Sequence, residues 1–294
     1  MDPRQQPTYA AITPARNEAA NLARLAPCMI SQEVRPKRWI IVDNGSTDDT
    51  AAIAKRLAGE HGWISLVVVG GAQVATRGAP VVRAFHSGLD ALEQDVEVIV
   101  KLDADVSFGS GYFAAQLDAF GRDPRLGISS GACLEPREDG SWLAARVTRG
   151  HVRGAVRAYR RECLEEIGPL EERMGWDGID ELKAQVRGWH TSTIPDLRFH
   201  HHRPLGFRER GPARWWRQGE MAHFMGYRPS YLIARTLYHV SREPSAATML
   251  LGYAACWAAG IGRCSDRAAL DHLRAQQRLR EMPRRIAEKL GSRV

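Results

Sequence analysis

The sequence predicts an α/β fold of the Rossmann-like kind, in which a mainly parallel sheet is flanked by helices and followed by a helical C-terminal extension. Strand and helix patterns alternate through the first hundred residues, which is typical of parallel strands joined by right-handed crossovers. Short polar motifs follow three of the strands. From Pro204 onward the pattern is helical and basic, with aromatic residues interleaved. Ligands of such sheets bind beyond the carboxyl ends of the strands, so we expect the functional site there.

The first half of the chain contains four apolar runs that end at turn residues. Asn17 can cap a helix that runs to about Ile30. A second helix contains AAIAKRL (51–57), and a third lies within 79–92. The strands predicted between these helices are Tyr9 to Ile12, Arg38 to Val42, Ile64 to Val69 and Val96 to Leu102.

The next hundred residues are less regular. The segment 154–168 indicates a strand and then a helix closed by Gly168. A turn leads into a helix within 176–188, and 191–202 is the final strand. We therefore expect a catalytic domain over 1–205, with halves at about 1–106 and 107–205. A basic helical region over 206–294 follows it.

Charge is distributed unevenly along the 294 residues. The net charge of +7 divides into −3 over 1–202 and +10 over 203–294. A basic region of this kind favours an anionic partner such as phospholipid, although a solvated basic face explains it as well. The five cysteines are scattered and show no CxxC pair, which excludes a disulfide scaffold and favours a reducing compartment. The N-terminus lacks the apolar segment of a signal peptide, so we expect a cytoplasmic protein.

The motif DAD follows the fourth strand, with Asp103 and Asp105 separated by one residue. Two carboxylates at a strand end suit Mg²⁺ or Mn²⁺, which take one or two protein carboxylates and bind substrate phosphates as well. An exposed acidic turn is the alternative. The sequence therefore predicts a divalent-cation site that would suit a nucleoside diphosphate.

Two further motifs follow the first and second strands. In DNGSTDDT, Asp43 can accept a hydrogen bond from a base or ribose, and Gly45 permits a tight turn. In TPARNE, Arg16 can reach a phosphate, and Glu18 can hold the base or the loop. Plain helix caps would explain both motifs equally well.

The three motifs, in this order and spacing, resemble glycosyltransferase family 2 with the GT-A fold. The resemblance continues to about His202. HVRGAVRAYRRECLEEIG resembles the acceptor-side segment of that family, GWDGIDELKAQVRGW resembles the segment that carries the catalytic base, and PDLRFHHHRP resembles the terminal strand.

The resemblance implies a role for each matching residue. Asp105 would be the main metal ligand, Asp103 would lie near the ribose or the metal, and His201 would touch the metal or the diphosphate. Asp180 would be the catalytic base, but the family's preceding acid is Ile179 here, so Glu181 is an alternative. Trp176 and Asp177 would contact the acceptor, although Trp176 could equally be a packed core aromatic. The residues around the nucleotide would be Thr13, Pro14, Arg16, Glu18, Asp43, Asn44 and Arg83.

Three consecutive histidines, His200 to His202, end the final predicted strand. Successive side chains of a strand point to opposite faces, so His201 should lie apart from its two neighbours. A single ion bound by all three would require a kink, and we expect only His201 to reach the metal.

The activity implied is inverting transfer of a sugar from a nucleoside-diphosphate donor, UDP-linked by preference, to an acceptor hydroxyl. The acceptor would be a saccharide or a lipid-linked molecule, in polysaccharide or glycolipid synthesis. The alternatives are a nucleotidyltransferase-like enzyme and a non-catalytic protein that binds nucleotide sugars or polyanions. The first should carry a glycine-rich phosphate loop after the first strand, and TPARNE has no glycine. Nucleic acid is not expected as a partner.

The segment Pro244 to Gly262 contains no charged residue. It is rich in Ala and Gly, which argues against a membrane span although its length would permit one. Internal packing and an interfacial helix are the two alternatives. We expect peripheral contact with an anionic membrane at its cytoplasmic face.

Overall fold

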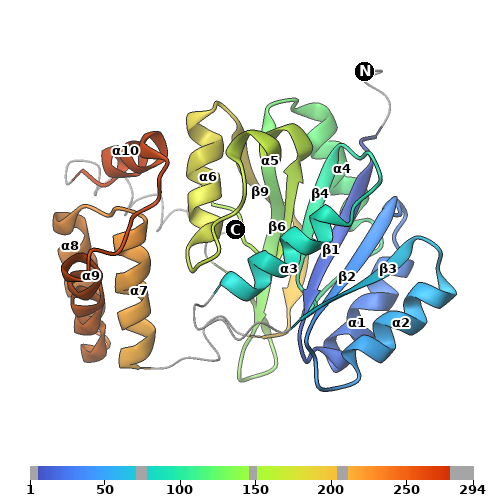
Figure 1. Ribbon diagram of the computed structural model, residues 1–294, viewed down its shortest axis with the longest axis horizontal. Coiled ribbons are helices and arrows are strands. Elements are labelled where there is room, and N and C mark those ends of the chain that lie inside the picture. Colours follow the sequence, from blue (N-terminus) through green and yellow to red (C-terminus); the bar gives the residue numbers. More distant parts are fainter. Residues whose placement is uncertain (1–5, 71–77, 146–150, 204–210, 279–294) are drawn as a thin grey trace. The chain divides into compact units, whose positions relative to one another are not determined.

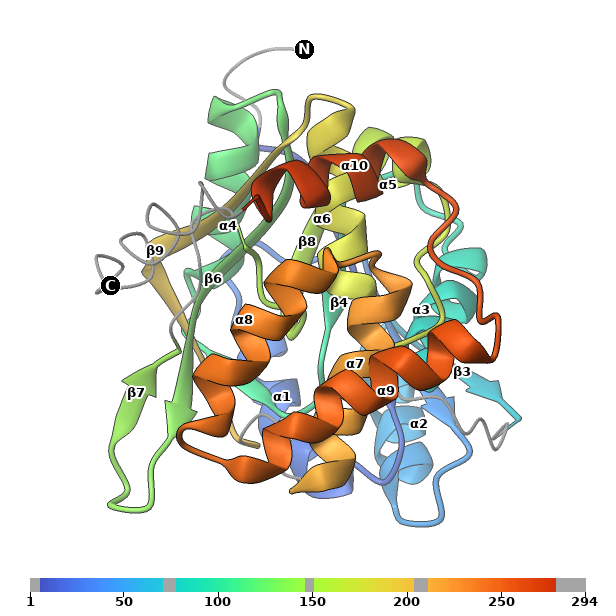
Figure 2. The ribbon, with the colours of Figure 1, turned by 90° about the vertical axis from the view of Figure 1, so that its left-hand side faces the viewer.

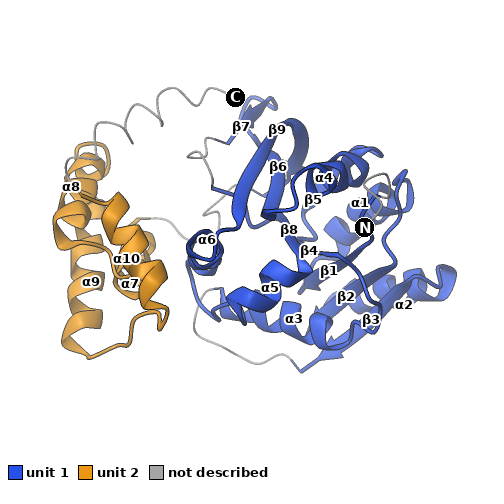
Figure 3. Cartoon of the chain, turned by 90° about the horizontal axis from the view of Figure 1, so that it is seen from above, with its two compact units in different colours: residues 1–203, 294 blue, residues 204–293 orange. Residues whose placement is uncertain are grey.

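The computed structural model describes residues 6–70, 78–145, 151–203 and 211–278. The chain divides after Arg203 into two compact units (Figure 3). Residues 279–294, part of the predicted basic region, lie outside the described residues.

The first unit is built on one sheet of nine strands, ordered β3-β2-β1-β4-β8-β6-β9-β5, with β7 paired to β6 (Figure 1). Strands β1 to β4 run parallel to one another as the sequence predicts, and β6 and β9 are also parallel, whereas β4 and β8 pair antiparallel. The strands are β1 (Tyr9–Ala15), β2 (Arg38–Asn44), β3 (Ile64–Val69), β4 (Val98–Leu102), β5 (Val106–Phe108), β6 (Leu126–Pro136), β7 (Trp142–Ala144), β8 (Val156–Arg160) and β9 (His190–His201).

Helices cover both faces of this sheet because successive strand residues point to opposite sides. Trp39 and Ile41 of β2 join one core, and Ile40 and Val42 join the other. The first core is covered by α1 (Ala19–Ile30), α2 (Thr50–Glu60) and α4 (Tyr112–Arg122). The second is covered by α3 (Ala79–Asp90), α5 (Arg161–Ile167) and α6 (Trp176–Val186). The predicted α/β class, with a mainly parallel sheet and C-terminal helices, is thereby confirmed.

The second unit is helical. It comprises α7 (Pro212–Phe224), α8 (Pro229–Val240), the 3₁₀ turn η1 (Pro244–Ala247), α9 (Thr248–Ala258) and α10 (Arg267–Gln276). Trp215, Leu232 and Met249 lie in its small core. No helix within the described part of the chain combines the length and apolar character that crossing a membrane requires.

Helices α7 and α9 approach each other through glycines. A Cβ atom on Gly219 would lie 2.1 Å from the carbonyl oxygen of Met249, and one on Gly252 would lie 2.2 Å from that of Trp216. Real Cβ atoms do not come so close to backbone atoms, so only glycine fits at either position.

Candidate functional site

The carboxyl ends of β1, β2 and β4 carry the three predicted motifs. Because the strands are parallel, all three lie at the same edge of the sheet. Asp43 is buried at the end of β2, and its Oδ1 has no hydrogen-bond partner among the described residues. A buried acceptor without a hydrogen bond destabilises the folded protein by about 1–3 kcal/mol. The unpaired Oδ1 of Asp43 is therefore suited to a donor on a ligand, such as a base N–H or a ribose hydroxyl.

The neighbouring nucleotide candidates differ in how exposed they are. The hydroxyl of Thr13 is buried and accepts a hydrogen bond from Trp39 at 2.9 Å. Pro14 is half-buried, and Arg16 projects into solvent. Asn44 is largely buried, and its amide lies 3.5 Å from the carbonyl oxygen of Pro80. Of this group, the exposed Arg16 has the freest side chain for contacting a phosphate.

Arg83 is separate from these loops. It lies on α3, and its half-exposed guanidinium pairs with Glu172. None of its described contacts joins it to the strand ends, so the structure does not bring Arg83 into the predicted nucleotide group.

The DAD motif and the final strand meet in one cluster. Asp103, Asp105 and His201 each offer a ligand atom, and these atoms all lie within 4.8 Å of one another. Nε2 of His201 lies 3.3 Å from Oδ1 of Asp105. Two carboxylates and an imidazole are a donor set that suits Mn²⁺ or Mg²⁺. His201 also belongs to a second group, with Cys133 and Glu135, but the thiol makes that group less suitable for a hard cation.

The other two histidines lie on the opposite side of β9. The rings of His200 and His202 contact the ring of Trp142, with centroids 4.5 and 5.3 Å apart. His202 also hydrogen-bonds to Ser107 at 2.8 Å. The alternation of a strand thus separates them from His201.

The carboxylate cluster contains the acidic side chains Asp103 and Asp105 and lies close to the basic side chains Lys101 and Arg203. Burial raises the pKa of Asp103, although Lys101 works against this. Burial also opposes ionisation of Asp105, but the hydrogen bond of His201 and the charge of Arg203 lower its pKa overall. For His201, burial disfavours the charged form, yet Asp105 raises the pKa to about 10.

Arg203 and Lys101 are site residues that the sequence reasoning missed. Nη2 of Arg203 donates to both carboxylate oxygens of Glu18, at 2.9 and 2.7 Å, and its Nε lies 3.5 Å from Oδ2 of Asp105. Lys101 pairs with Asp103 and donates to the carbonyl oxygen of Gly154 at 2.9 Å. A lysine inside the apolar run VEVIVKL is a signal that could have revealed Lys101. For Arg203, the only signal in the sequence is its position directly after the three histidines.

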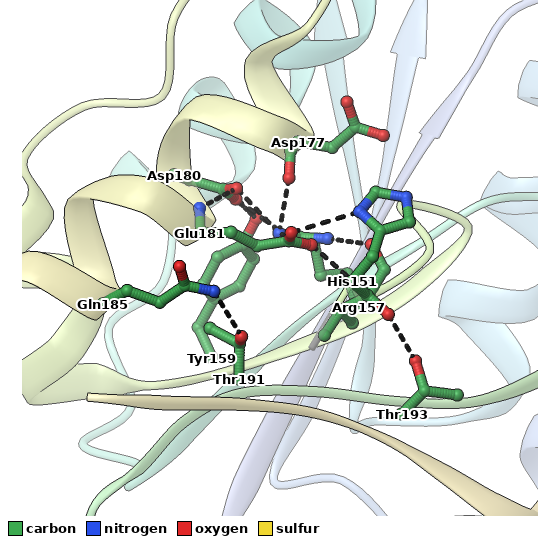
Figure 4. Close-up of polar contacts among 10 residues, drawn as sticks. His151, Arg157, Tyr159, Asp177, Asp180, Glu181, Gln185, Thr191 and Thr193 are labelled. Atoms are coloured by element: carbon green, nitrogen blue, oxygen red, sulfur yellow. Dashed lines mark hydrogen bonds and ion pairs between the residues drawn. The ribbon is translucent and has the colours of Figure 1, made fainter. Parts of the chain in front are cut away.

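The segment expected to hold the base forms a network with Arg157, Tyr159 and His151 (Figure 4). Asp180 is 2% exposed and accepts hydrogen bonds from Arg157 at 2.7 and 3.0 Å, from Tyr159 at 2.5 Å and from its neighbour's N–H at 2.6 Å. Glu181 is also buried and accepts from Arg157, at 3.0 Å, and from the backbone of Val152, at 2.7 Å. Both carboxylates are therefore committed to a buried arginine.

This placement speaks against Asp180 or Glu181 as the catalytic base. Burial raises the pKa of Asp180 to about 7 despite the opposing charge of Arg157, a value that would suit proton transfer at neutral pH. A base must, however, reach the proton that it abstracts, and geometry takes precedence over pKa. In this structure the Asp180 carboxylate already accepts four hydrogen bonds from the protein itself.

Asp177, one turn earlier in α6, has a different environment. It is half-buried and lies in the first turn of the helix. Its Oδ2 lies 3.5 Å from the point where a Cβ on Gly154 would stand, and the carbonyl oxygen of that glycine receives Lys101. Asp177 therefore lies near Gly154, whose carbonyl oxygen accepts from the lysine that pairs with Asp103.

Trp176 precedes it and is buried. The Nζ atom of Lys101 and the guanidinium of Arg157 lie 5.4 and 5.8 Å from its ring centroid. This position favours the packed-aromatic alternative over stacking on an acceptor sugar.

Comparison with known proteins agrees with this arrangement. Residues 10–149 match the model of glycosyl transferase family 2. No curated protein sequence gives a significant match.

Solved structures of glycosyltransferases share the fold. One is the mannosyltransferase PcManGT from Pyrobaculum calidifontis in complex with GDP-Man and Mn²⁺, which has 22% identity and a TM-score of 0.59 over 98% of this chain and 85% of that one. GalNAc-T7 with UDP, GalNAc and Mn²⁺ has 15% identity and a TM-score of 0.60 over 83% of this chain, which spans about half (52%) of that protein. S. aureus TarS 1-349 has 15% identity and a TM-score of 0.52, over 76% of this chain and 66% of that one. The chain therefore shares the GT-A fold of these glycosyltransferases, and its residues 10–149 match glycosyl transferase family 2.

Proposed function

We propose that the enzyme transfers a sugar from a nucleoside-diphosphate donor to an acceptor hydroxyl with inversion at the anomeric carbon. The observation that carries this proposal is the meeting of Asp103, Asp105 and His201 at the same edge of the sheet as Asp43, whose buried Oδ1 has no hydrogen-bond partner among the described residues. Two of the structural relatives described above are complexes, PcManGT with GDP-Man and Mn²⁺ and GalNAc-T7 with UDP, GalNAc and Mn²⁺, which supports a nucleotide-sugar donor. A UDP-sugar remains our preferred donor.

Asp105, Asp103 and His201 would hold the divalent cation, Mn²⁺ or Mg²⁺. Bound there, the cation would stabilise the negative charge that develops on the departing diphosphate. The proximity of two carboxylates, one imidazole and no competing thiol within this group supports the choice.

We infer that Arg203 takes part in donor binding. It connects Glu18, beyond β1, with Asp105, beyond β4, and so lies between the residues proposed for the nucleotide and for the cation. A guanidinium can bind phosphate oxygens in pairs as it binds a carboxylate. Arg203 would exchange its carboxylate partners for the diphosphate when the donor arrives.

We propose Asp177 as the general base, in place of Asp180. Its carboxylate is the one in the segment 176–181 that is neither buried nor held by Arg157. It would accept the proton of the attacking hydroxyl while the oxygen displaces the diphosphate from the opposite face of the sugar. The network of Arg157, Asp180 and Glu181 would hold the first turn of α6 in position, since Arg157 also donates to the carbonyl oxygen of Asp177 at 2.8 Å.

The acceptor would be a saccharide or a lipid-linked molecule, at the cytoplasmic face of a membrane. The basic excess of residues 203–294 supports this location. The decisive experiment for the reaction is a screen of donor hydrolysis with UDP-, GDP- and dTDP-sugars in the presence of Mn²⁺. Cation-dependent release of one nucleoside diphosphate is expected. If no donor is hydrolysed or bound with any cation, the proposed activity is wrong.

A further inference from the structure

Helix α9 exposes an apolar stripe. The helix carries no charged residue, and its buried side, which includes Met249 and Gly252, faces α7. Away from that contact, Leu251 is 57% exposed, Trp257 is 69% exposed and Ile261, just beyond the helix, is 44% exposed. A helix that is apolar on all sides is normally enclosed by protein or by lipid. Within the described part of the second unit, nothing covers this stripe.

Helix α8 also exposes apolar side chains. It contacts η1 and α9, and the two helices lie next to each other in Figure 2. Ile233, Leu237 and Tyr238 of α8 are all exposed, although single residues of this size are usually scattered on a protein surface. Several exposed apolar residues on adjoining helices instead mark an interaction surface.

In the sequence, arginines lie on both sides of the segment that contains α9. Arg242 precedes η1, and its guanidinium stacks 4.4 Å over the ring of Tyr238. Arg263 follows Ile261 and is exposed. The sequence between these arginines has a single acidic residue, Glu243, which hydrogen-bonds to Ser245. An apolar stripe with aromatic residues and with cations at its ends is the arrangement of helices that lie in a membrane interface.

We propose that α8 and α9 form a membrane-docking face for an anionic phospholipid surface. Leu251, Trp257 and Ile261 would enter the apolar layer, and Arg242 and Arg263 would pair with lipid phosphates. The eleven residues of α9 span about 16 Å, roughly half of the hydrocarbon thickness, so the helix would lie in the plane of the membrane. A symmetric contact with a second copy would bring like charges of the arginines together, which favours lipid as the occupant.

This inference deepens the membrane location proposed above, and it can be tested apart from the transfer reaction. Flotation of the full-length protein with phosphatidylglycerol vesicles at low salt should recover it with the lipid, while phosphatidylcholine vesicles should not. Leu251→Glu should weaken the binding by about tenfold or more, because a buried leucine side chain is replaced by a charge. The matched control is Leu143→Glu, since Leu143 is 50% exposed in β7 of the first unit. That variant should float like the wild type.

The contribution of the arginine charges and the depth of insertion into the lipid are tested separately. Arg242→Gln and Arg263→Gln should each weaken binding by about fivefold, equivalent to ~1 kcal/mol, and added salt should do the same. Arg122→Gln, which removes an exposed arginine from the first unit, is the control. Brominated lipids should quench the tryptophan emission of the wild type more than that of Trp257→Phe.

Three results would overturn the inference. The protein could stay with the soluble fraction at low salt, or Leu251→Glu could float as well as Leu143→Glu. Sedimentation could also show a dimer that Leu251→Glu dissociates, in which case a second copy covers the face. Donor hydrolysis should be measured on the same samples, and it should persist in every variant. Loss of lipid binding with hydrolysis intact would contradict only the membrane-docking face, whereas absence of hydrolysis in the wild type would contradict the proposed function.

Discussion

Nη2 and Nε of Arg157 donate hydrogen bonds to the two carboxylate oxygens of Asp180 at 2.7 and 3.0 Å, and both side chains are buried. Arg157 also binds Glu181 and the carbonyl oxygen of Asp177. One buried arginine therefore organises the helix turn on which the proposed base lies. This relationship distinguishes Asp180, which is held by Arg157, from Asp177, which we propose as the base.

Replacing the two aspartates should have opposite effects. Asp177→Asn should lower kcat by about 10²-fold, the usual scale for a lost general base, and leave the free energy of unfolding within about 0.5 kcal/mol of the wild type. Asp180→Asn should destabilise the fold by about 1–3 kcal/mol, because an amide NH₂ cannot accept the hydrogen bonds that Arg157 and Tyr159 donate to the carboxylate. Steady-state kinetics and urea unfolding of both variants check this. A stable but inactive Asp180→Asn enzyme would restore Asp180 as the base.

Removing Asp105 should abolish the cation site. Asp105→Asn should weaken Mn²⁺ binding by about 100-fold or more, since loss of even an outer partner of a metal ligand costs about 10–100-fold. Titration of the donor-free protein with Mn²⁺, followed by electron paramagnetic resonance, measures this directly. Asp118→Asn, on the exposed side of α4, is the matched control and should bind Mn²⁺ like the wild type. Equal affinities for the two variants would mean that the ion binds elsewhere.

Arg203→Gln should weaken the binding of a nucleoside diphosphate in the presence of Mn²⁺ by about tenfold or more, as expected for a lost hydrogen-bonded charge. Calorimetry with UDP and GDP measures the change. Arg24→Gln removes the same charge from an exposed position on α1, where the guanidinium contacts Asn21, and should have little effect. If both variants lose affinity equally, only the net charge near the site matters.

Stability should also depend on pH through His151. Burial lowers the pKa of this histidine, but the hydrogen bond and charge of Glu181, with Asp177 nearby, raise it overall. A raised folded-state pKa means that the charged histidine stabilises the protein below the unfolded pKa, and this contribution is lost as pH rises through the folded value. His151→Gln should remove this pH-dependent contribution to the free energy of unfolding, measured by denaturation at pH values from below the unfolded pKa to above the folded pKa of the histidine. An unchanged pH profile in the variant would assign the effect to another group.

Gly252→Ala should destabilise the second unit by about 1–3 kcal/mol or more, because the added methyl group would lie 2.2 Å from the carbonyl oxygen of Trp216. Gly59→Ala in α2 is the control, since nothing lies within 4 Å of its added Cβ. That variant should be slightly more stable, by up to about 1 kcal/mol, through the better helix propensity of alanine. Hydrogen exchange of α7 and α9 would detect the loosening. A neutral Gly252→Ala variant would mean that the helices separate without cost.

Much of the nucleotide half of the fold follows from the sequence. The predicted strands at Tyr9, Arg38, Ile64 and Val96 correspond to β1 to β4, because buried parallel strands are apolar runs that end at recognisable turns. The sequence predicts no helix or strand over residues 106–145. This segment contains β6, whose Gly- and Ser-containing sequence LGISSGACLEP has little of the composition of a buried strand.

The sequence leaves the base open between Asp180 and Glu181 and places Asp177 at the acceptor, so it does not predict the proposed role of Asp177. Asp177 and Asp180 lie on the same helix, three residues apart, and either could face the acceptor. The residue that decides is Arg157, on β8, and its approach to Asp180 depends on how α6 packs against the sheet. Arg203 was missed for a similar reason, since its partners are distant in the chain.

The contact between Arg203 and Glu18 joins positions 185 residues apart. Strand β9, which delivers His201 and Arg203, pairs with β6 and β5 rather than with the early strands. During synthesis, β1 to β4 leave the ribosome well before this strand. A nascent or prematurely terminated chain would therefore have Asp103 and Asp105 but would lack His201 and Arg203, which complete the carboxylate cluster. Competence for transfer should arise only after residue 203 has emerged, so incomplete products would be unable to consume activated sugar.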